Sequence, residues 1–356
     1  MKIGFLKLFG AISGLFCSGL TSVAANSFAG ASSYFLYTLQ QSDRIAVLDA
    51  MQDAGLKTLR IFITQVAENI KGCTNTAVND VEVGSPGNWD DTILSMINTL
   101  ISEAMPRGIK LIIAPHDRYA LGCWQSDVYV SKYNIPTSDC ATAPNNASIF
   151  YLNADAIADY DKRLDHILSY QYTNGTPWSQ LSDGIFAFNI ENEAMGHMDM
   201  VDNQWWCHRS GTIRTALGSS SIYVSTGGGA DWTDSLNYYN FYCTAIDIID
   251  IHSYDGTSAI NSNMPGAINT ATQQGKLLMM EEWGVTGSDS DKASGMTSQI
   301  NALNGYGVPW SLWEVVKPSS NDYETFTDET QAWAAIRAGA QSADSASGAF
   351  TFRNLP

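Results

Sequence analysis

Two acidic clusters, each at the end of an apolar run, are the residues best suited to do chemistry. One apolar run ends in Glu191-Asn192-Glu193, and another ends in Glu281-Glu282. Charge at the end of an apolar strand is costly unless it has a use. Two carboxylates that face one cleft can cleave an acetal, because one protonates the leaving oxygen while the other attacks or stabilises the sugar carbon. The alternative is that these acids only cap helices or pair with an arginine.

The elements that position these acids repeat a strand-then-helix pattern. Short apolar runs recur along the chain, and several are apolar at nearly every residue, which is typical of strands covered on both faces. The runs are Phe28–Phe35, Leu56–Phe62, Ile109–Pro115, Gly184–Ile190, Ile222–Ser225, Ile246–Tyr254, Leu277–Trp283 and Val308–Val316. Helical spacing of apolar residues predicts helices between them, at Asp43–Gly55, Asp90–Arg107, Asp155–Tyr170, Asn203–Leu217, Pro265–Gln274, Lys292–Leu303 and Glu329–Ala340. The segment after Ile222–Ser225 gives only a short, weak helical signal.

Strands that alternate with helices imply right-handed βαβ units, and this number of units implies a closed (β/α)8 TIM barrel in one domain. An open doubly wound sheet would usually carry a glycine-rich phosphate turn after its first strand, and residues 29–32 do not supply one. Gly227-Gly228-Gly229 precedes no convincing helix, so we interpret it as a flexible loop. We expect a signal peptide at residues 1–25, the catalytic barrel at 26–341 and a tail at 342–356.

In such barrels the chemistry lies at the C-terminal ends of the strands. The polar and aromatic residues at those ends are Arg60, His116, Asp117, Glu191, Asn192, Glu193, His252, Tyr254, Glu281, Glu282, Trp313 and Glu314.

Composition limits the partner. The formal net charge is −17, which disfavours nucleic acid and anionic membranes and suits a neutral ligand. Trp and Tyr number 10 and 16, and their rings can pack on sugar faces as well as in cores. No zinc spacing, His-Glu-x-x-His pair or nucleophile elbow occurs, so we expect no metal and no cofactor.

The start of the chain predicts secretion. Lys2 and Lys7 precede a short apolar stretch that ends in small residues at 23–25, as in a signal peptide, and the stretch is shorter than the roughly 20 residues of a membrane span. In a secreted chain the five later cysteines form disulfides with one left over. Cys123–Cys140 is favoured because both fall in one long loop. Cys207–Cys243 is a guess that leaves Cys73 free, and the pairing stays open at this point. Asn146 and Asn174 begin glycosylation tripeptides.

These motifs resemble the glycoside hydrolases of family 5, the cellulase and β-mannanase family of retaining β/α-barrel enzymes, over about Phe28 to Ala340. The matching positions, in chain order, are Arg60, His116, Asn192-Glu193, His252-Ser253-Tyr254, Glu282-Trp283-Gly284 and Trp313. Ser33-Tyr34-Phe35-Leu36 is similar to the start of secreted fungal β-mannanases in this family. The chain departs from the pattern at Ala194, where the family usually has proline, and this leaves the subfamily and the substrate open.

The resemblance implies a role for each matching residue. Glu193 would be the acid/base and Glu282 the nucleophile, with a raised pKa for Glu193 and an ionised Glu282. Arg60 and Tyr254 would hydrogen-bond Glu282, and Asn192 would bind the hydroxyl next to the reacting carbon. His116 and His252 would position sugar and catalytic groups, and Trp313 would stack under the sugar that is cut.

Glu281 and Glu191 are rivals for these roles. Neighbouring strand residues point to opposite faces, so only one of Glu281 and Glu282 should face the cleft. Glu191 and Glu193 are two apart, so alternation cannot separate them. The family pattern selects Glu193 and Glu282. Glu314 has no assigned role beyond a contact to substrate.

The sequence therefore predicts a secreted, monomeric, retaining endo-β-glycosidase that acts on a neutral polysaccharide, with β-1,4-mannan as the best single substrate. The close alternative is a β-glucanase of the same family, either cellulase-like or specific for β-1,3/1,6-glucan. A non-catalytic carbohydrate-binding barrel would usually have lost one carboxylate. A metal-dependent hydrolase would need clustered His and Asp ligands, for which only His116 and His252 are available.

Overall fold

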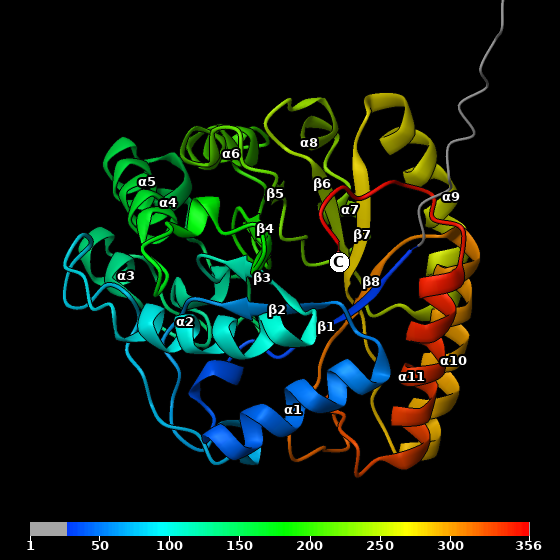
Figure 1. Cartoon of the computed structure of the whole chain (residues 1–356). Coiled ribbons are helices and arrows are strands. Elements are labelled where there is room, and N and C mark those ends of the chain that lie inside the picture. Colours follow the sequence, from blue (N-terminus) through cyan, green and yellow to red (C-terminus); the bar gives the residue numbers. More distant parts are fainter. Residues whose placement is uncertain (1–26, 356) are drawn as a thin grey trace, which may run out of the picture.

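The fold is a closed barrel of eight parallel strands with helices outside it (Figure 1). This is a computed structural model, and it describes residues 27–355. The predicted signal peptide lies outside these residues. The strands follow chain order around the barrel, and β1 closes on β8. They are β1 (Ala29–Ser32), β2 (Thr58–Phe62), β3 (Lys110–Ala114), β4 (Ile185–Asn189), β5 (Tyr223–Ser225), β6 (Ile248–His252), β7 (Leu277–Glu282) and β8 (Trp310–Leu312).

Each strand lies inside one of the eight apolar runs, so the predicted (β/α)8 barrel is confirmed. The strands are buried at almost every position, because barrel side chains fill the interior and outer side chains lie under helices. The helices are α1 (Gln41–Ala54), α2 (Thr92–Ala104), α3 (Val128–Tyr133), α4 (Ser148–Leu152), α5 (Ala154–Ser169), α6 (Trp205–Leu217), α7 (Trp232–Ser235), α8 (Tyr238–Tyr242), α9 (Gly256–Gln274), α10 (Asp289–Tyr306) and α11 (Thr330–Ser345).

Local signals explain where several helices begin and end. Gly55 ends α1 in the left-handed conformation at φ 87°, which a residue without Cβ adopts freely. The Asn153 side chain accepts hydrogen bonds at the start of α5, and Ser288 with Asp291 forms a capping box on α10. The structure differs at α9, which begins at Gly256, well before the predicted start at Pro265. Pro265 suggested a helix start, whereas it lies inside a helix that already buries Ile260 and Met264 before it.

The C-terminal tail closes the end of the barrel opposite to the site. α11 runs to Ser345, so the predicted boundary at residue 341 falls inside this helix. Beyond it the chain crosses the N-terminal ends of the strands, as the red segment in Figure 1 shows. There the Phe352 ring packs edge-on against Phe28, with 5.1 Å between centroids, and close to Phe186 and Tyr223. The half-buried Phe352 therefore packs against the apolar cluster at this end of the barrel.

Two disulfides fix connections outside the barrel. Cys123 in the β3–α3 connection is bonded to Cys140 in the α3–α4 connection, and Cys207 on α6 is bonded to Cys243 after α8. Cys73 is buried and is not bonded to another cysteine. The favoured pair Cys123–Cys140 is confirmed, and the guess Cys207–Cys243 with a free Cys73 agrees with the structure. Among residues 27–355, no helix is long and apolar enough to cross a membrane.

Candidate active site

A cavity of about 590 Å³ lies where the strands end and contains most of the predicted site residues. Glu193, Glu282, Asn192, Tyr254 and Trp313 line it. Arg60 and His252 do not line it, and both are fully buried in direct contact with the two glutamates. The remaining lining residues are Tyr34, Phe62, Ile70, Lys71, Asp117, Tyr119, Trp124, Gln125, His197, Ala230 and Tyr323.

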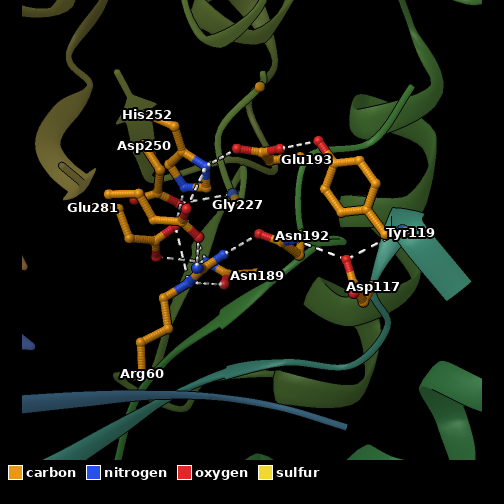
Figure 2. Close-up of polar contacts among 12 residues, drawn as sticks. Arg60, Asp117, Tyr119, Asn189, Asn192, Glu193, Gly227, Asp250, His252 and Glu281 are labelled. Atoms are coloured by element: carbon orange, nitrogen blue, oxygen red, sulfur yellow. Dashed lines mark hydrogen bonds and ion pairs between the residues drawn. The ribbon is translucent and has the colours of Figure 1, made fainter. Parts of the chain in front are cut away.

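Arg60 on β2 is the cation at the centre of the site (Figure 2). Its guanidinium donates to Glu282, to Asn192 Oδ1 at 2.8 Å and to Asn189 Oδ1 at 3.0 Å. It also lies 3.2 Å from a carboxylate oxygen of Glu281. A planar fork of donors can hold several acceptors in one arrangement, which a lysine cannot do. Arg60 thereby fixes residues from β4 and β7 relative to each other.

Glu282 is the carboxylate of β7 that faces the cavity. Its second oxygen accepts a hydrogen bond from Tyr254 Oη at 3.1 Å. Glu281 is fully buried behind it, 3.1 Å from His252 Nε2 and 2.9 Å from Asn189 Nδ2. A register shift between β6 and β7 pairs His252 with Glu282 and separates the two acids in depth. Of these neighbours, only Glu282 is open to a ligand.

Glu193 faces Glu282 from the loop after β4. One of its oxygens lies 2.8 Å from His252 Nδ1, and the other accepts a hydrogen bond from Tyr119 Oη. The backbone of Glu193 is left-handed at φ 46°, as are Met195 at φ 61° and His197 at φ 53°. Left-handed backbone at residues other than glycine is uncommon and gathers at functional sites. The turn at residues 193–197 therefore adopts an energetically unfavourable backbone conformation that points Glu193 into the cavity.

Glu191 and His116 form a buried pair outside the cavity. His116 is fully buried, with Nδ1 2.6 Å from Glu191 and Nε2 2.8 Å from Asp127. Tyr151 Oη donates to the other oxygen of Glu191 at 3.1 Å. The expectation that His116 positions sugar directly is therefore wrong. Glu191 is fully buried away from the cavity, whereas Glu193 lines it. The alternation of strand side chains could not predict this difference.

Gly227-Gly228-Gly229 is not a flexible loop, which corrects the interpretation from sequence. All three glycines are buried. A Cβ on Gly227 would lie 2.1 Å from the carbonyl oxygen of Glu191, and one on Gly228 would lie 2.3 Å from the ring of His252. Glu193 N donates to Gly227 O at 2.9 Å. Glycine is needed here because backbone and imidazole pack closely beneath the acid/base candidate.

The charges of the site are strongly coupled. His252 lies between carboxylates at both ring nitrogens, and their charge raises its pKa to about 10 although burial opposes this. Burial raises the pKa of Glu282, and the charges of Glu193 and Glu281 add to that rise. The pKa of Glu193 is lowered in spite of burial, because His252 and Tyr119 donate to it. From the sequence we expected a raised pKa for Glu193 and an ionised Glu282. The directions of the two pKa shifts are the reverse of that expectation.

Glu314 and Lys71 form an ion pair beside the cavity. Lys71 Nζ lies 2.7 Å from Glu314 and 2.5 Å from Glu324, and it is about 6 Å from the rings of Tyr34 and Trp313. Burial raises the pKa of Glu314 to about 7. Glu314 itself is fully buried and does not line the cavity, so the contact to substrate considered for it is not available.

Sequence reasoning missed Tyr119, Trp124 and Lys71 in the cavity wall. All three lie in long connections rather than at strand ends, so no periodic signal marks them. The single available hint was that Trp124 follows Cys123 in a loop predicted to carry a disulfide.

The separation of the two carboxylates defines what the site can do. One oxygen of Glu193, one oxygen of Glu282 and a nitrogen of His252 lie within 4.8 Å of one another. Retaining glycosidases hold their carboxyls about 5–5.5 Å apart, whereas inverting ones leave room for a water. These three groups could also hold a cation, but His252 is engaged at both nitrogens and Arg60 already occupies Glu282. The arrangement therefore fits acid–base and nucleophilic work on an acetal.

A (β/α)8 barrel with two facing glutamates at its C-terminal rim has the architecture of a glycoside hydrolase. The family described as Cellulase (glycosyl hydrolase family 5) matches residues 22–319, and the chain belongs to this family. A comparison with curated protein sequences gives no match.

Several solved structures share the fold at low identity. The endo-1,4-beta-mannanase from Rhizomucor miehei is 16% identical with a TM-score of 0.66, covering 90% of this chain and 95% of that one. A glycoside hydrolase family 5 mannosidase from the same organism is 12% identical with a TM-score of 0.70, covering 89% and 93%. The endo-beta-1,4-mannanase from Thermotoga petrophila is 17% identical with a TM-score of 0.69, covering 90% and 77%.

Proposed function

We propose that this protein is a secreted, retaining β-glycosidase that hydrolyses β-1,4-mannan, with Glu193 as acid/base and Glu282 as nucleophile. The observation that carries the proposal is the approach of the two carboxylates to within 4.8 Å across one cavity. Mannan is favoured because the similar solved structures include mannanases and a mannosidase. Secretion is supported by the signal-like start of the chain and by the two disulfides, which are typical of oxidising compartments.

In the first step Glu282 attacks the anomeric carbon while Glu193 gives its proton to the departing glycosidic oxygen. The carbon–oxygen bond to the leaving sugar breaks, and a glycosyl ester forms on Glu282. In the second step Glu193 takes a proton from water, whose oxygen attacks the same carbon and releases the carboxylate of Glu282. Two inversions give net retention.

Substrate binding must place a proton on Glu193, because hydrogen bonds from His252 and Tyr119 lower the pKa of this carboxyl. A glycosidic oxygen next to Glu193 accepts a hydrogen bond and so favours the neutral acid. Arg60 and Tyr254 donate to Glu282 and favour its anion. His252 Nδ1 lies 2.8 Å from Glu193 and 3.6 Å from Glu282, so its positive charge lies close to both carboxylates.

The experiment is a panel of β-mannan, a soluble cellulose derivative, xylan and β-1,3/1,6-glucan with reducing-end detection, together with Glu193→Gln and Glu282→Gln. We expect mannan to be cut fastest and each variant to lose at least about a thousandfold in kcat, since each removes a group that reacts directly. Asp53→Asn on the outer face of α1 is the matched control and should keep full activity.

The anomeric form of the first product tests the mechanism. Proton NMR should show the β anomer first. Initial α product would contradict retention, and normal turnover in either glutamine variant would refute the assignment of that glutamate. Faster cleavage of the cellulose derivative would replace mannan with the β-glucan that the family description also suggests.

A further inference from the structure

Trp124 is the exposed tryptophan of the cavity wall. It is 57% exposed, and the other tryptophans among residues 27–355 are buried or half-buried. A single exposed apolar side chain is ordinary by itself, so its location decides its meaning. Trp124 also lines the same cavity as the two glutamates.

Trp124 lies on the Glu193 side of this cavity. Its ring stacks on Tyr119, with 4.2 Å between centroids and 29° between planes, and Tyr119 Oη donates to Glu193. Trp313, Tyr34 and Phe62 form a separate aromatic group, in which Trp313 and Tyr34 are 5.5 Å apart and nearly parallel. The aromatic pair beside Glu193 is thus distinct from the group around Trp313.

The position of Trp124 beside Glu193 decides which sugar of the substrate it can contact. Glu193 protonates the oxygen that leaves, so the sugar attached to that oxygen must lie beside Glu193. Aromatic faces suit the apolar face of a pyranose ring. Trp124 is therefore placed to stack on the first sugar of the leaving group.

The cavity continues past this position. His197 meets the rings of Tyr119 and Trp124 at 62° and 65°, and it lines both the main cavity and a second one of about 410 Å³. The other lining residues of the second cavity are Pro144, Asn145, Asn146, Ser148, Met198, Asp199 and Val201. Most of the polar groups there are neutral, which suits hydroxyl groups.

This wall is held in place before any ligand arrives. The Cys123–Cys140 disulfide fixes the residue before Trp124. Asn145 is buried, and its side chain donates to Gly122 O at 3.2 Å and to Pro136 O at 2.5 Å. Arg118 donates to the backbone and side chain of Asn145. A preformed wall lowers the entropy that is lost when a ligand binds.

We propose that Trp124 and His197 bind the leaving side of a neutral β-linked glycan, with the first sugar on Trp124 and the next over the second cavity. The inference rests on the proposed function and deepens it, because it makes the enzyme depend on an oligosaccharide leaving group. The same surface would bind an incoming oligosaccharide as acceptor for the glycosyl-enzyme.

The test compares two substrates that differ in the leaving group. β-1,4-Mannohexaose occupies the leaving side, whereas β-mannobiosyl fluoride releases only fluoride. Trp124→Ala should lower kcat/KM on mannohexaose by at least about tenfold, which equals about 1.4 kcal/mol, and leave the fluoride reaction within about twofold. Tyr238→Ala removes another exposed aromatic residue, 63% exposed on α8 and outside the cavity lining, and should change neither reaction.

A second measurement does not depend on steady-state turnover. The enzyme is trapped as its 2-deoxy-2-fluoro-mannosyl ester, and its reactivation by added β-1,4-mannobiose is followed. The disaccharide should accelerate reactivation of the wild type much more than that of Trp124→Ala or His197→Ala.

The outcomes separate this inference from the proposed function. If Trp124→Ala keeps wild-type rates on mannohexaose, or loses as much on the fluoride, the tryptophan does not bind the leaving side. If the wild-type enzyme cleaves neither substrate nor any glycan of the panel, the proposed function itself fails.

Discussion

At the scale of single residues, the site is a balance of buried charge. Arg60 and His252 face Glu193, Glu281 and Glu282, and Asp250 lies behind them on β6. Burial alone would neutralise these acids, but a fork of donors and an imidazolium supply the compensating charge. One acid of each cluster, Glu193 and Glu282, lines the cavity, and these are the two that the sequence pattern selects. The low pKa of Glu193 was not predictable, because it depends on hydrogen bonds from His252 and Tyr119 whose geometry no motif marks.

Tyr119→Phe should shift the pH profile of the enzyme. The Tyr119 hydroxyl donates to Glu193 and lowers its pKa, so removing it should raise that pKa. Glu193 must be protonated for the first step, so the basic limb of kcat/KM should move to higher pH, by roughly one unit for a lost charge-assisted hydrogen bond. The pH profile of kcat/KM on a mannooligosaccharide measures this shift.

The phenyl ring at position 119 keeps its stacking partner Trp124, so leaving-side binding should persist in this variant. Tyr34→Phe removes a hydroxyl from the same cavity without contact to either glutamate, and its profile should match that of the wild type. An unmoved basic limb in Tyr119→Phe would show that Tyr119 does not tune the acid.

At the scale of elements, the strands were predictable and the connections were not. Strand residues such as Leu111 and Ile113 are apolar and fully buried because helices cover the sheet, and this leaves a continuous apolar run in the sequence. Connections such as that between β3 and α3 carry Tyr119 and Trp124 in conformations set by one disulfide and by scattered side-chain contacts. Such contacts do not recur at a regular spacing along the sequence, so no sequence pattern predicts them. Gly228 shows the same limit, because the ring against which it packs belongs to the distant His252.

The double variant Cys123→Ser/Cys140→Ser should lose stability and leaving-side binding together. The bond spans a sequence separation of 17 residues, and opening a loop of that size costs about 3 kcal/mol of unfolding free energy. The loosened segment carries Trp124, so kcat/KM should fall on mannohexaose and hold on mannobiosyl fluoride. Urea unfolding and the two kinetic assays measure these effects.

The other disulfide provides the control. Cys207→Ser/Cys243→Ser opens a bond outside the cavity lining and should lower stability by a similar amount. Its ratio of rates on the two substrates should stay at the wild-type value. An equal change of that ratio in both double variants would mean that general loosening, rather than the position of Trp124, controls leaving-side binding.

At the scale of the whole molecule, buried charges occur in pairs. Arg60 from β2 and His252 from β6 lie against acids of β7 inside the barrel. Arg163 bridges Asp80 and Glu82 below the rim, and His116 bridges Glu191 and Asp127. These buried bridges join the β3 and β4 ends to the long connections that form the cavity wall, so stability and site geometry depend on the same ionisations.

The unfolding free energy should therefore fall as pH rises from about 7.5 to 9. The carboxylates around His116 raise its pKa from 6.5 to about 9, so the folded state keeps a proton that the unfolded chain has already lost. The stabilisation is complete below pH 6.5 and is lost as pH passes through about 9, and His252, with a pKa near 10, adds a loss of the same sign. Each retained proton gives a slope of up to about 1.4 kcal/mol per pH unit. Burial raises the pKa of Glu314 to about 7 and that of Cys73 to about 11. These two groups therefore change the unfolding free energy mainly below and above this pH window.

Urea unfolding across this pH window measures the effect of His116. The slope should be shallower in His116→Gln, whereas His208→Gln, at an exposed position, should keep the wild-type slope. Should His116→Gln not fold, the ring protons of His116 in the wild type still report its titration by NMR. A wild-type slope of zero, or a His116 ring that titrates near its ordinary value of 6.5, would show that the buried bridge does not hold its proton.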